Sequence, residues 1–397
     1  MTEHLAPARV NAGHGSGRAG GGQRRAACRW VFELLLGFFV LLMAHNATAY
    51  PQYIGRGDSR CADCHYSPTG GGLLNSWGRE RRPSSFDLGN PEDWFGHGDA
   101  SGVGATGSPE FGFDVGGDVR TLPLLSRGDS PGAVAFIPML IEVGAVAAYG
   151  PLQLYGTMTL RKGVGDGPPY LLFSREHWLK YALNSRLALR AGRMVLPFGI
   201  RTPDHTQYVR EDFGFDKYNQ SYALELDWTR EDLTLSAAGF AGDPVYEAPD
   251  RREAGGALRG SYFIVKPFEV GVSALVGRSD ARNRVALGPF LRVTPVEGVY
   301  VLGEFAYQKF DYQRSDQTLS ENALFGRAGW FVLPALDVYL EAGYRKLSGG
   351  TDFDKLRYAV GANWQLYKWF EFIPQLMVEQ QDAGTQLFAM GQLHLIY

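Results

Sequence analysis

Hydrophobic and polar residues alternate with a period of two from Phe111 to the end of the chain. Within 152–161, leucine and methionine occupy one face, while glutamine, threonine and arginine occupy the other. The stretch 336–345 repeats this pattern, with aspartate, glutamate and arginine on its polar face. Such alternation is typical of β-strands whose two faces meet different surroundings. The region after residue 110 is therefore predicted to be all-β.

Sixteen strands of this kind are predicted. Their approximate bounds are 111–122, 134–149, 152–162, 170–183, 186–194, 220–229, 232–241, 253–265, 268–278, 284–294, 299–311, 321–333, 336–346, 355–366, 369–380 and 385–397. The least regular is 170–183, where Arg175 and His177 interrupt the alternation. A spacing of about 18 residues per strand and connection suits an outer-membrane barrel, whose strands need roughly 9–11 residues to cross the bilayer.

The predicted connections alternate between short and long. Short turns fall at 150–151, 184–185, 230–231, 266–267, 334–335 and 367–368, and long connections at 123–133, 163–169, 195–219, 242–252, 312–320 and 347–354. Outer-membrane barrels have short periplasmic turns and longer external loops. We therefore predict a 16-stranded antiparallel transmembrane barrel over 111–397, surrounded by outer-membrane lipid, with both termini on the periplasmic side. A soluble propeller is the alternative, but no motif recurs at a blade-like period.

The composition agrees with a barrel. Glycine (51 residues) and aromatic residues (13%) are abundant, as expected of amphipathic strands, turns and interfacial girdles. Seven aromatic residues lie near predicted strand ends: Tyr149, Trp228, Tyr262, Trp330, Trp364, Tyr367 and Trp369. The terminal Tyr397 on an amphipathic strand resembles the assembly signal of outer-membrane barrels. A net charge of −3 gives no reason to expect a nucleic-acid partner.

Residues 1–49 are predicted to be a signal peptide with an extended N-terminus. Arginines precede the apolar run 31–44, and a small-x-small cleavage site follows at 47–49. This order of regions is that of a secretory signal. A transmembrane anchor is the alternative, but an apolar run of this length, containing Glu33, is too short for a bilayer core of about 30 Å.

The sequence Cys61-Ala62-Asp63-Cys64-His65 lies near the predicted mature N-terminus. C-x-x-C-H is the covalent attachment signal for c-type haem. Two thiols must reach two vinyl groups on one porphyrin edge, and the adjacent imidazole must ligate the iron. Cys61 and Cys64 are therefore predicted to form the thioethers, with His65 as proximal ligand. A disulfide and a metal half-site are the alternatives, but zinc would need a second ligand pair at similar spacing.

The sequence leaves the sixth iron ligand open. His97 is the nearest histidine in the same segment and is the candidate distal ligand. Segment 50–110 contains no methionine, so a methionine ligand would come from the barrel, for example Met194 or Met390. This polar, glycine-rich segment is too small to bury a haem by its own core. We therefore predict that it plugs the periplasmic half of the lumen, near His394 of the last strand.

The connection 195–219 is the longest predicted external loop. In general porins the third external loop folds into the lumen as a constriction, and the stretch 190–199 resembles phosphate-selective porins. Four residues of this loop could attract or bind a cation: Asp204, His205, Glu211 and Asp212. A solvated loop is the simpler interpretation of such a charged stretch.

A signal peptide, one C-x-x-C-H motif and a porin-like barrel in one chain resemble the fused outer-membrane cytochrome–porins. The motif at 61–65 followed by 74–79 is similar to the haem segment of that family, from which the run 68–72 departs. The resemblance implies one covalent haem c, a periplasmic electron carrier such as a soluble cytochrome, and an extracellular metal ion or redox partner. In that family the proteins oxidise extracellular ferrous iron and pass electrons inward.

Three functional hypotheses result. The first is an outer-membrane electron conduit that passes electrons through a single haem between an extracellular donor or acceptor and periplasmic carriers. With Fe(II) as the donor, the protein would act as a ferrous iron oxidase. The second is a selective solute or anion porin with a structural or sensory haem. The third is an interaction barrel that docks a multihaem partner.

Overall fold

The computed structural model describes residues 54, 61–87, 100–102, 108–128, 132–162, 170–202, 204, 206–216, 219–244, 247, 250, 252–315, 317–350, 352–382 and 384–397. All of them belong to one compact unit, Ala44–Tyr397. The predicted signal peptide lies outside these residues, and so do His97 and His205.

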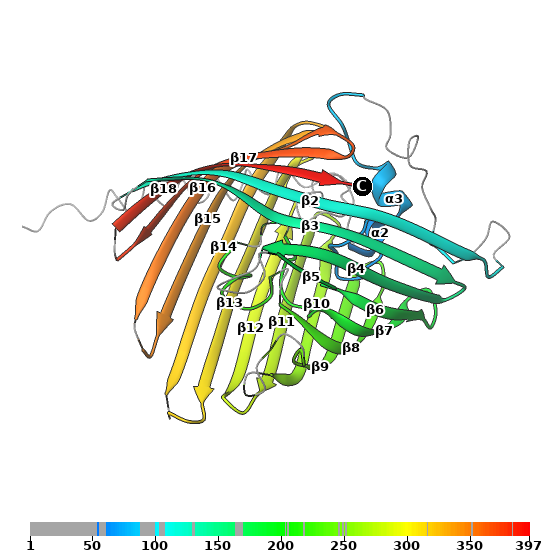
Figure 1. Cartoon of the computed structure of the whole chain (residues 1–397), viewed down its shortest axis with the longest axis horizontal. Helices are drawn as coiled ribbons and strands as arrows, with labels where there is room; N and C mark the ends of the chain where they lie inside the picture. Colours follow the sequence, from blue (N-terminus) through cyan, green and yellow to red (C-terminus); the bar gives the residue numbers. More distant parts are fainter. Residues whose placement is uncertain are drawn as a thin grey trace, which may run out of the picture. The chain divides into compact units, whose positions relative to one another are not determined.

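The described chain forms two short helices and a closed antiparallel barrel (Figure 1). The helices are α2 (Cys61–Cys64) and α3 (Ser76–Glu80). The strands are β2 (Phe111–Gly128), β3 (Ala133–Tyr149), β4 (Leu152–Lys162), β5 (Tyr170–Phe173), β6 (His177–Ala182), β7 (Leu187–Val195), β8 (Gln220–Thr229), β9 (Leu233–Ala241), β10 (Ala254–Val265), β11 (Phe268–Arg278), β12 (Arg282–Val293), β13 (Val299–Tyr312), β14 (Thr318–Leu333), β15 (Leu336–Ser348), β16 (Phe353–Tyr367), β17 (Phe370–Gln381) and β18 (Gly384–Ile396). Strands adjacent in sequence pair with one another, and β18 pairs with β2 to close the barrel.

The fold predicted from the alternation is confirmed. Both β5 and β6 pair with β4, so they are two parts of one strand interrupted at 174–176, and the described barrel has sixteen strands. The interruption falls at Arg175, where the alternation is also irregular. Most observed strand ends lie within a few residues of the predicted ones. Successive side chains of a strand point to opposite faces, so the residues at which the alternation starts and stops mark the ends of the strand.

The predicted connections need correction at the long-loop end. Strand β2 continues to Gly128, so the predicted connection 123–133 shortens to 129–132. At this end only three residues separate β11 from β12, and only two separate β17 from β18, so the alternation of short and long connections is wrong there. The reason is that strands pair through backbone hydrogen bonds, which continue beyond the part of the strand that the apolar pattern marks.

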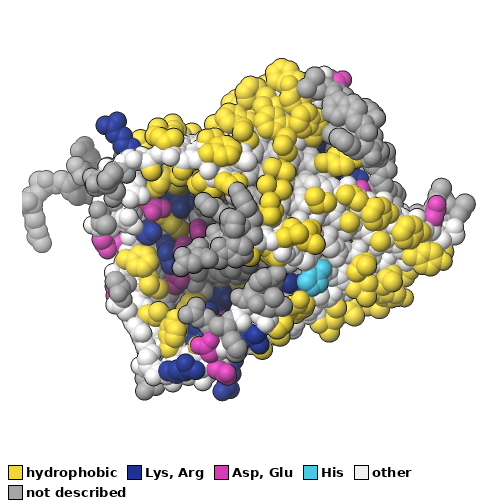
Figure 2. Space-filling model, in the orientation of Figure 1, with side chains coloured by type: hydrophobic (Ala, Val, Ile, Leu, Met, Phe, Trp, Pro, Cys, Tyr) yellow, Lys and Arg dark blue, Asp and Glu magenta, His cyan; other side chains and the backbone are white. Residues whose placement is uncertain are grey.

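The two faces of the barrel wall have opposite character. On β8, Glu225 is fully buried, whereas Leu224 and Leu226 are 55% and 42% exposed. Polar side chains thus line the lumen, and apolar side chains cover the outer surface, as Figure 2 shows for one face. This arrangement suits a barrel surrounded by lipid. Within the described ranges, no helix is long and apolar enough to cross a membrane.

Aromatic side chains gather at the short-turn end of the barrel. Tyr149, Tyr262 and Trp330 are exposed near the ends of β3, β10 and β14. Tyr367 and Trp369 stack at the turn between β16 and β17, with ring centroids 5.4 Å apart. These positions agree with the predicted interfacial girdle, since aromatic rings favour the boundary between lipid and water.

The connection between β7 and β8, here called loop 3 (196–219), folds into the lumen. Its buried side chains include seven large apolar ones: Leu196, Phe198, Ile200, Tyr208, Val209, Phe213 and Phe215. Loop 3 also bonds to strands far from its own: Arg210 reaches Glu304 of β13 at 2.6 Å, and Tyr208 donates to Glu379 of β17 at 2.8 Å. Loop 3 therefore packs inside the lumen, in the way the third external loop of general porins does.

Candidate functional site

The C-x-x-C-H motif begins with the single helical turn α2. The His65 backbone N–H donates to the Cys61 carbonyl at 3.0 Å, and His65 forms a β-bridge with Leu74. Cys61 and Cys64 do not form a disulfide with each other. Burial, followed by the positive charge of Arg201, lowers the pKa of the His65 imidazole to about 4. The ring is therefore neutral at physiological pH, which is the form that ligates metals.

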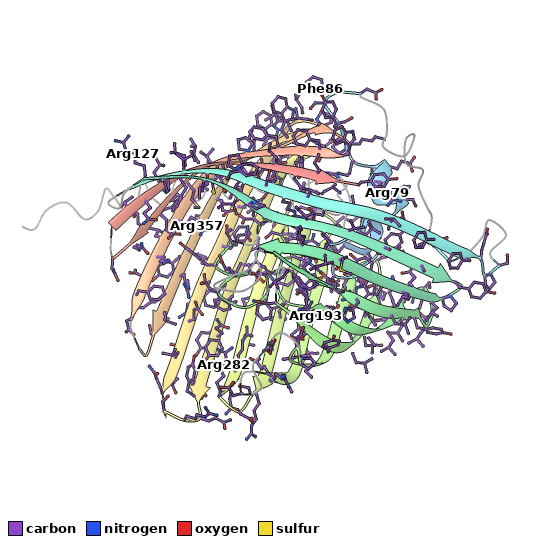
Figure 3. All side chains as sticks on the ribbon, viewed as in Figure 1. Arg79, Phe86, Arg127, Arg193, Arg282 and Arg357 are labelled. Atoms are coloured by element: carbon purple, nitrogen blue, oxygen red, sulfur yellow. The ribbon has the colours of Figure 1, made fainter. Side chains whose placement is uncertain are left out.

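Buried polar contacts fix the segment after the motif to the inner face of the barrel. The Tyr66 hydroxyl and the Arg79 guanidinium both donate to Asp114 of β2, at 2.6 and 2.8 Å. The Leu73 backbone N–H donates to the Tyr155 hydroxyl of β4 at 3.3 Å. Figure 3 labels Arg79, which belongs to α3, at one end of the barrel. One buried carboxylate thus holds two points of the segment thirteen residues apart.

Strands β6 and β7 hold the opposite side of the same segment. Lys180 donates to the Tyr66 carbonyl at 3.1 Å, and Arg190 donates to the Ser67 hydroxyl at 2.9 Å. Arg190 is itself fully buried and pairs with Glu225. The segment therefore rests on charged side chains of the barrel interior, which belong to strands more than a hundred residues later in the chain.

The glycine run 70–72 brings the segment close to three other side chains. All three glycines have a positive φ, of 82°, 70° and 64°, which L side chains rarely adopt. A Cβ atom at Gly71 would lie 2.8 Å from the Arg201 guanidinium, and one at Gly72 would lie 2.6 Å from the Tyr155 hydroxyl. The run that departs from the cytochrome–porin resemblance is thus the part of the segment that loop 3 touches.

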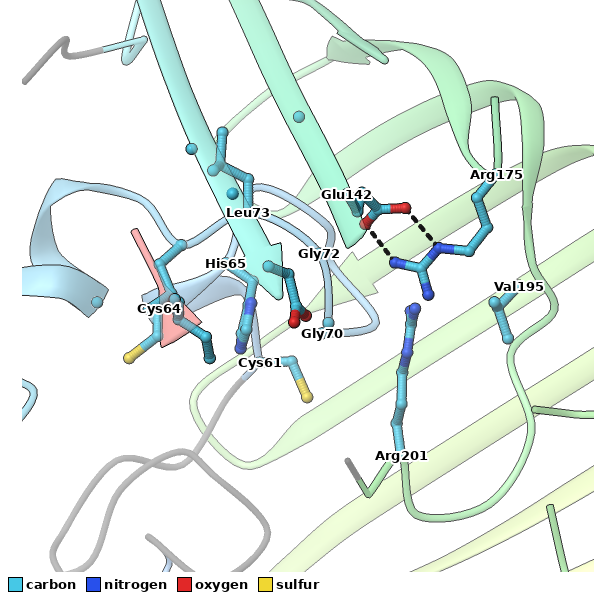
Figure 4. Close-up of a pocket in the computed structure, with 18 of the residues that line it drawn as sticks. Cys61, Cys64, His65, Gly70, Gly72, Leu73, Glu142, Arg175, Val195 and Arg201 are labelled. Atoms are coloured by element: carbon cyan, nitrogen blue, oxygen red, sulfur yellow. Dashed lines mark hydrogen bonds and ion pairs between the residues drawn. The ribbon is translucent and has the colours of Figure 1, made fainter. Parts of the chain in front are cut away.

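A cavity with about 1530 Å³ of empty space, open solvent included, lies beside the motif (Figure 4). Cys61, Cys64 and His65 all border it. Glycines of β2 and β3 form part of its wall and place no side chains in it: Gly116, Gly117 and Gly144. Loop 3 and the end of β18 complete the wall: Thr202, Arg210, Phe215, Asp216, Ile396 and Tyr397. The two thiols and the imidazole of the motif thus face one shared open space.

The charged side chains that border the cavity are mainly arginines. Six arginines line it: Arg81, Arg82, Arg120, Arg175, Arg201 and Arg210. Four carboxylates line it: Asp118, Glu142, Asp216 and Glu371. An excess of guanidinium groups favours ligands that carry carboxylate or phosphate groups. Sequence reasoning found the motif and loop 3, but it did not identify Arg201 or the glycines of the wall.

The histidine and methionine residues considered for the sixth position of the haem iron differ in where they lie. His97 lies outside the described residues. Met194 is fully buried in the hydrophobic core, and neither it nor Met390 borders the cavity. His394 is fully buried, with its two ring nitrogens 3.1 Å from Glu371 and 3.0 Å from Asp118. Both ring nitrogens of His394 therefore have a carboxylate partner in this structure. Among the described residues, no group of three or more histidine, cysteine, aspartate or glutamate side chains is arranged to hold a metal ion.

The acidic residues of loop 3 take part in interactions within the protein. Asp212 pairs with Arg345 at 2.8 Å, and Asp204 accepts a bond from the Thr206 backbone N–H at 2.9 Å. Burial raises the pKa of Asp212 to about 6 and also raises that of Glu211. The described part of loop 3 therefore agrees better with a packed constriction than with a cation site.

Comparisons with known proteins place the fold. No protein-family model matches the chain, and no curated protein does. Solved structures do match: a loop-deletion mutant of OmpT, an outer-membrane protein of Vibrio cholerae, covers 72% of this chain and 99% of its own at 12% identity and a TM-score of 0.59. The chain has the fold of the outer-membrane porins.

Two further structures are similar at this level. An anion-selective porin from Comamonas acidovorans is 13% identical, covers 72% of this chain and all of its own, and has a TM-score of 0.56. The outer-membrane channel DcaP of Acinetobacter baumannii is 9% identical, covers 74% of this chain and 99% of its own, and has the same TM-score. At these identities the likeness concerns the fold.

Proposed function

We propose that this protein is an outer-membrane barrel that carries one covalent c-type haem in its lumen and transfers electrons through it. The observation that carries the proposal is that Cys61, Cys64 and His65 all border one cavity, together with loop 3. The apolar outer surface supports a location in the outer membrane.

The residues around the cavity fit such a group. Cys61 and Cys64 lie on one helical turn, and the His65 ring that follows them is neutral at physiological pH. Gly116, Gly117 and Gly144 line the cavity without side chains, and a Cβ atom at Gly116 would collide with Leu73 and the Tyr397 carbonyl. When bound, the haem would supply a one-electron redox centre whose potential depends on its ligands and on burial.

The position of the cavity supports electron transfer across the barrel. The lipid-facing band of such barrels is about 25 Å tall, so a redox centre outside the barrel would be too far from the opposite side. The segment 61–80 and loop 3 meet inside the lumen, where Arg201 donates to Thr69 at 3.2 Å. Periplasmic carriers would approach from the short-turn end. An extracellular donor, with Fe(II) as our first candidate, would approach loop 3 from the other side.

The second candidate function is a selective anion porin in which the haem is structural or sensory. Two observations favour it: the similar solved structures are named as porins and channels, and arginines predominate among the charged groups that line the cavity. Against an open pore stands the packing of loop 3, whose buried side chains and ion pairs cross the lumen.

One pair of measurements separates the two functions. Purified protein is mixed anaerobically with excess Fe(II) in a stopped-flow spectrometer, and its ion conductance is recorded in planar lipid bilayers. The conduit predicts rapid reduction of the haem bands and a low conductance. The porin predicts a stable, anion-selective conductance that a Cys61→Ser/Cys64→Ser variant retains. Haem bands that Fe(II) leaves oxidised would exclude the ferrous oxidase.

A further inference from the structure

Arg201 is the point where loop 3 meets the segment that carries the motif. Its guanidinium donates to the Thr69 hydroxyl at 3.2 Å and to Glu176 at 3.0 Å. It also borders the cavity, and Figure 4 shows it facing the same space as His65. The absence of a side chain at Gly71 is what allows this approach.

Two other arginines that border the cavity, Arg175 and Arg210, each bind both oxygens of a carboxylate, unlike Arg201. Arg175 binds both oxygens of Glu142 through two nitrogens, and Arg210 binds both oxygens of Glu304. Arg201 has one bond to a carboxylate and one to a hydroxyl, through one atom each. A guanidinium has five N–H donors in a fixed fork. Arg201 therefore retains donors for a further acceptor in the cavity.

We propose that Arg201 binds a propionate carboxylate of the haem and thereby couples the conformation of loop 3 to the haem reduction potential. This inference rests on the proposed function, since it requires the haem. A haem carries two propionates, and arginine is the side chain best suited to bind a carboxylate with two parallel hydrogen bonds. The positive charge also favours the reduced iron over the oxidised iron, because reduction removes one positive charge from the centre.

The hydrogen bond from Arg201 to Glu176 helps to hold the guanidinium in position. Glu176 is buried at the interruption between β5 and β6, and it orients Arg201 toward the segment. Thr69 orients the guanidinium from the other side. A side chain held at two points loses little further conformational freedom when it binds a ligand, so the site is organised before the carboxylate arrives.

The test is spectroelectrochemical titration of the full-length, haem-loaded protein in detergent. Arg201→Gln is compared with Arg201→Lys, which keeps the charge but loses the fork. Arg357→Gln is the matched control, because Arg357 also bonds to loop 3, through the Thr206 carbonyl at 2.9 Å, but does not border the cavity. Figure 3 shows Arg357 in the part of the barrel away from α3.

We expect Arg201→Gln to lower the ratio of reduced to oxidised haem about tenfold at the wild-type midpoint, which is 59 mV for a one-electron couple. Arg201→Lys should recover most of this shift, and Arg357→Gln should show none. An unchanged midpoint in Arg201→Gln, or an equal shift in Arg357→Gln, overturns the role of Arg201 and leaves the haem in place. Absence of haem bands from the wild-type protein would instead overturn the proposed function.

Discussion

The ion pair between Arg210 and Glu304 should decide whether loop 3 stays in the lumen. Glu304 is 2% exposed, accepts two bonds from Arg210, and also accepts the Ile200 backbone N–H at 2.7 Å. Glu304→Gln keeps the volume of the side chain but leaves the Arg210 charge buried without its counter-ion. Removing one partner of a buried pair costs about 3–5 kcal/mol.

The size of the effect follows from this free energy. At about 1.4 kcal/mol per factor of ten, the population of undocked loop should rise between roughly 100-fold and a few thousand-fold. Hydrogen exchange of the Ile200 and Gly199 amides reports this opening directly, because they donate to Glu304 of β13 and Ser273 of β11. Conductance in planar bilayers should rise in parallel, as the constriction leaves the lumen.

Two variants serve as controls. Asp311→Asn lies on the same strand, in a pair with Lys309 that is nearly half exposed, and should leave the exchange of the loop 3 amides unchanged. The double variant Glu304→Gln/Arg210→Met removes both charges and should restore most of the protection. The reasoning is refuted if Glu304→Gln exchanges its loop 3 amides at the wild-type rate, or if Asp311→Asn has an equal effect.

Three further predictions concern the segment and loop 3. Asp114→Asn should release the segment 61–80 from Tyr66 onward, at a cost of about 3–5 kcal/mol, and limited proteolysis there would detect it. Gly71→Ala should weaken the same docking by roughly 1–2 kcal/mol or more through its positive φ and the crowding of Arg201. The raised pKa of Asp212, about 6, means that docked loop 3 holds a proton more tightly than released loop 3. Docking should therefore weaken as pH rises from about 4 to about 6, and Asp212→Asn should remove this pH dependence of the bilayer conductance.

The barrel could be predicted from the sequence because each strand reports its two surroundings through neighbouring residues. The alternation within 152–162 or 336–346 can be recognised from those residues alone. The observed strands β4 and β15 begin at the first residue of each alternating stretch. The motif Cys61–Cys64 with His65 is equally local. By contrast, the extension of β2 to Gly128 depends on a partner strand that continues to pair with it.

The surroundings of the motif could not be predicted in the same way. Arg201 reaches Thr69 across 132 positions of sequence, and His394 reaches Asp118 across 276. Such contacts depend on the register of the whole barrel, which a period-two pattern leaves undetermined between strands. The strand pattern places His394 on the lumen face, but only the closed barrel reveals the two carboxylates beside its ring. The run of glycines at 70–72 was the one local sign that another side chain approaches the segment.

The central claim is that the lumen holds one haem bound covalently through Cys61 and Cys64. The most direct measurement is the intact mass of the barrel purified from outer membranes, with the Cys61→Ser/Cys64→Ser variant alongside. We expect a wild-type mass greater than that of the polypeptide by one haem, and a variant with the mass of the polypeptide alone. A wild-type protein with the polypeptide mass alone would contradict it.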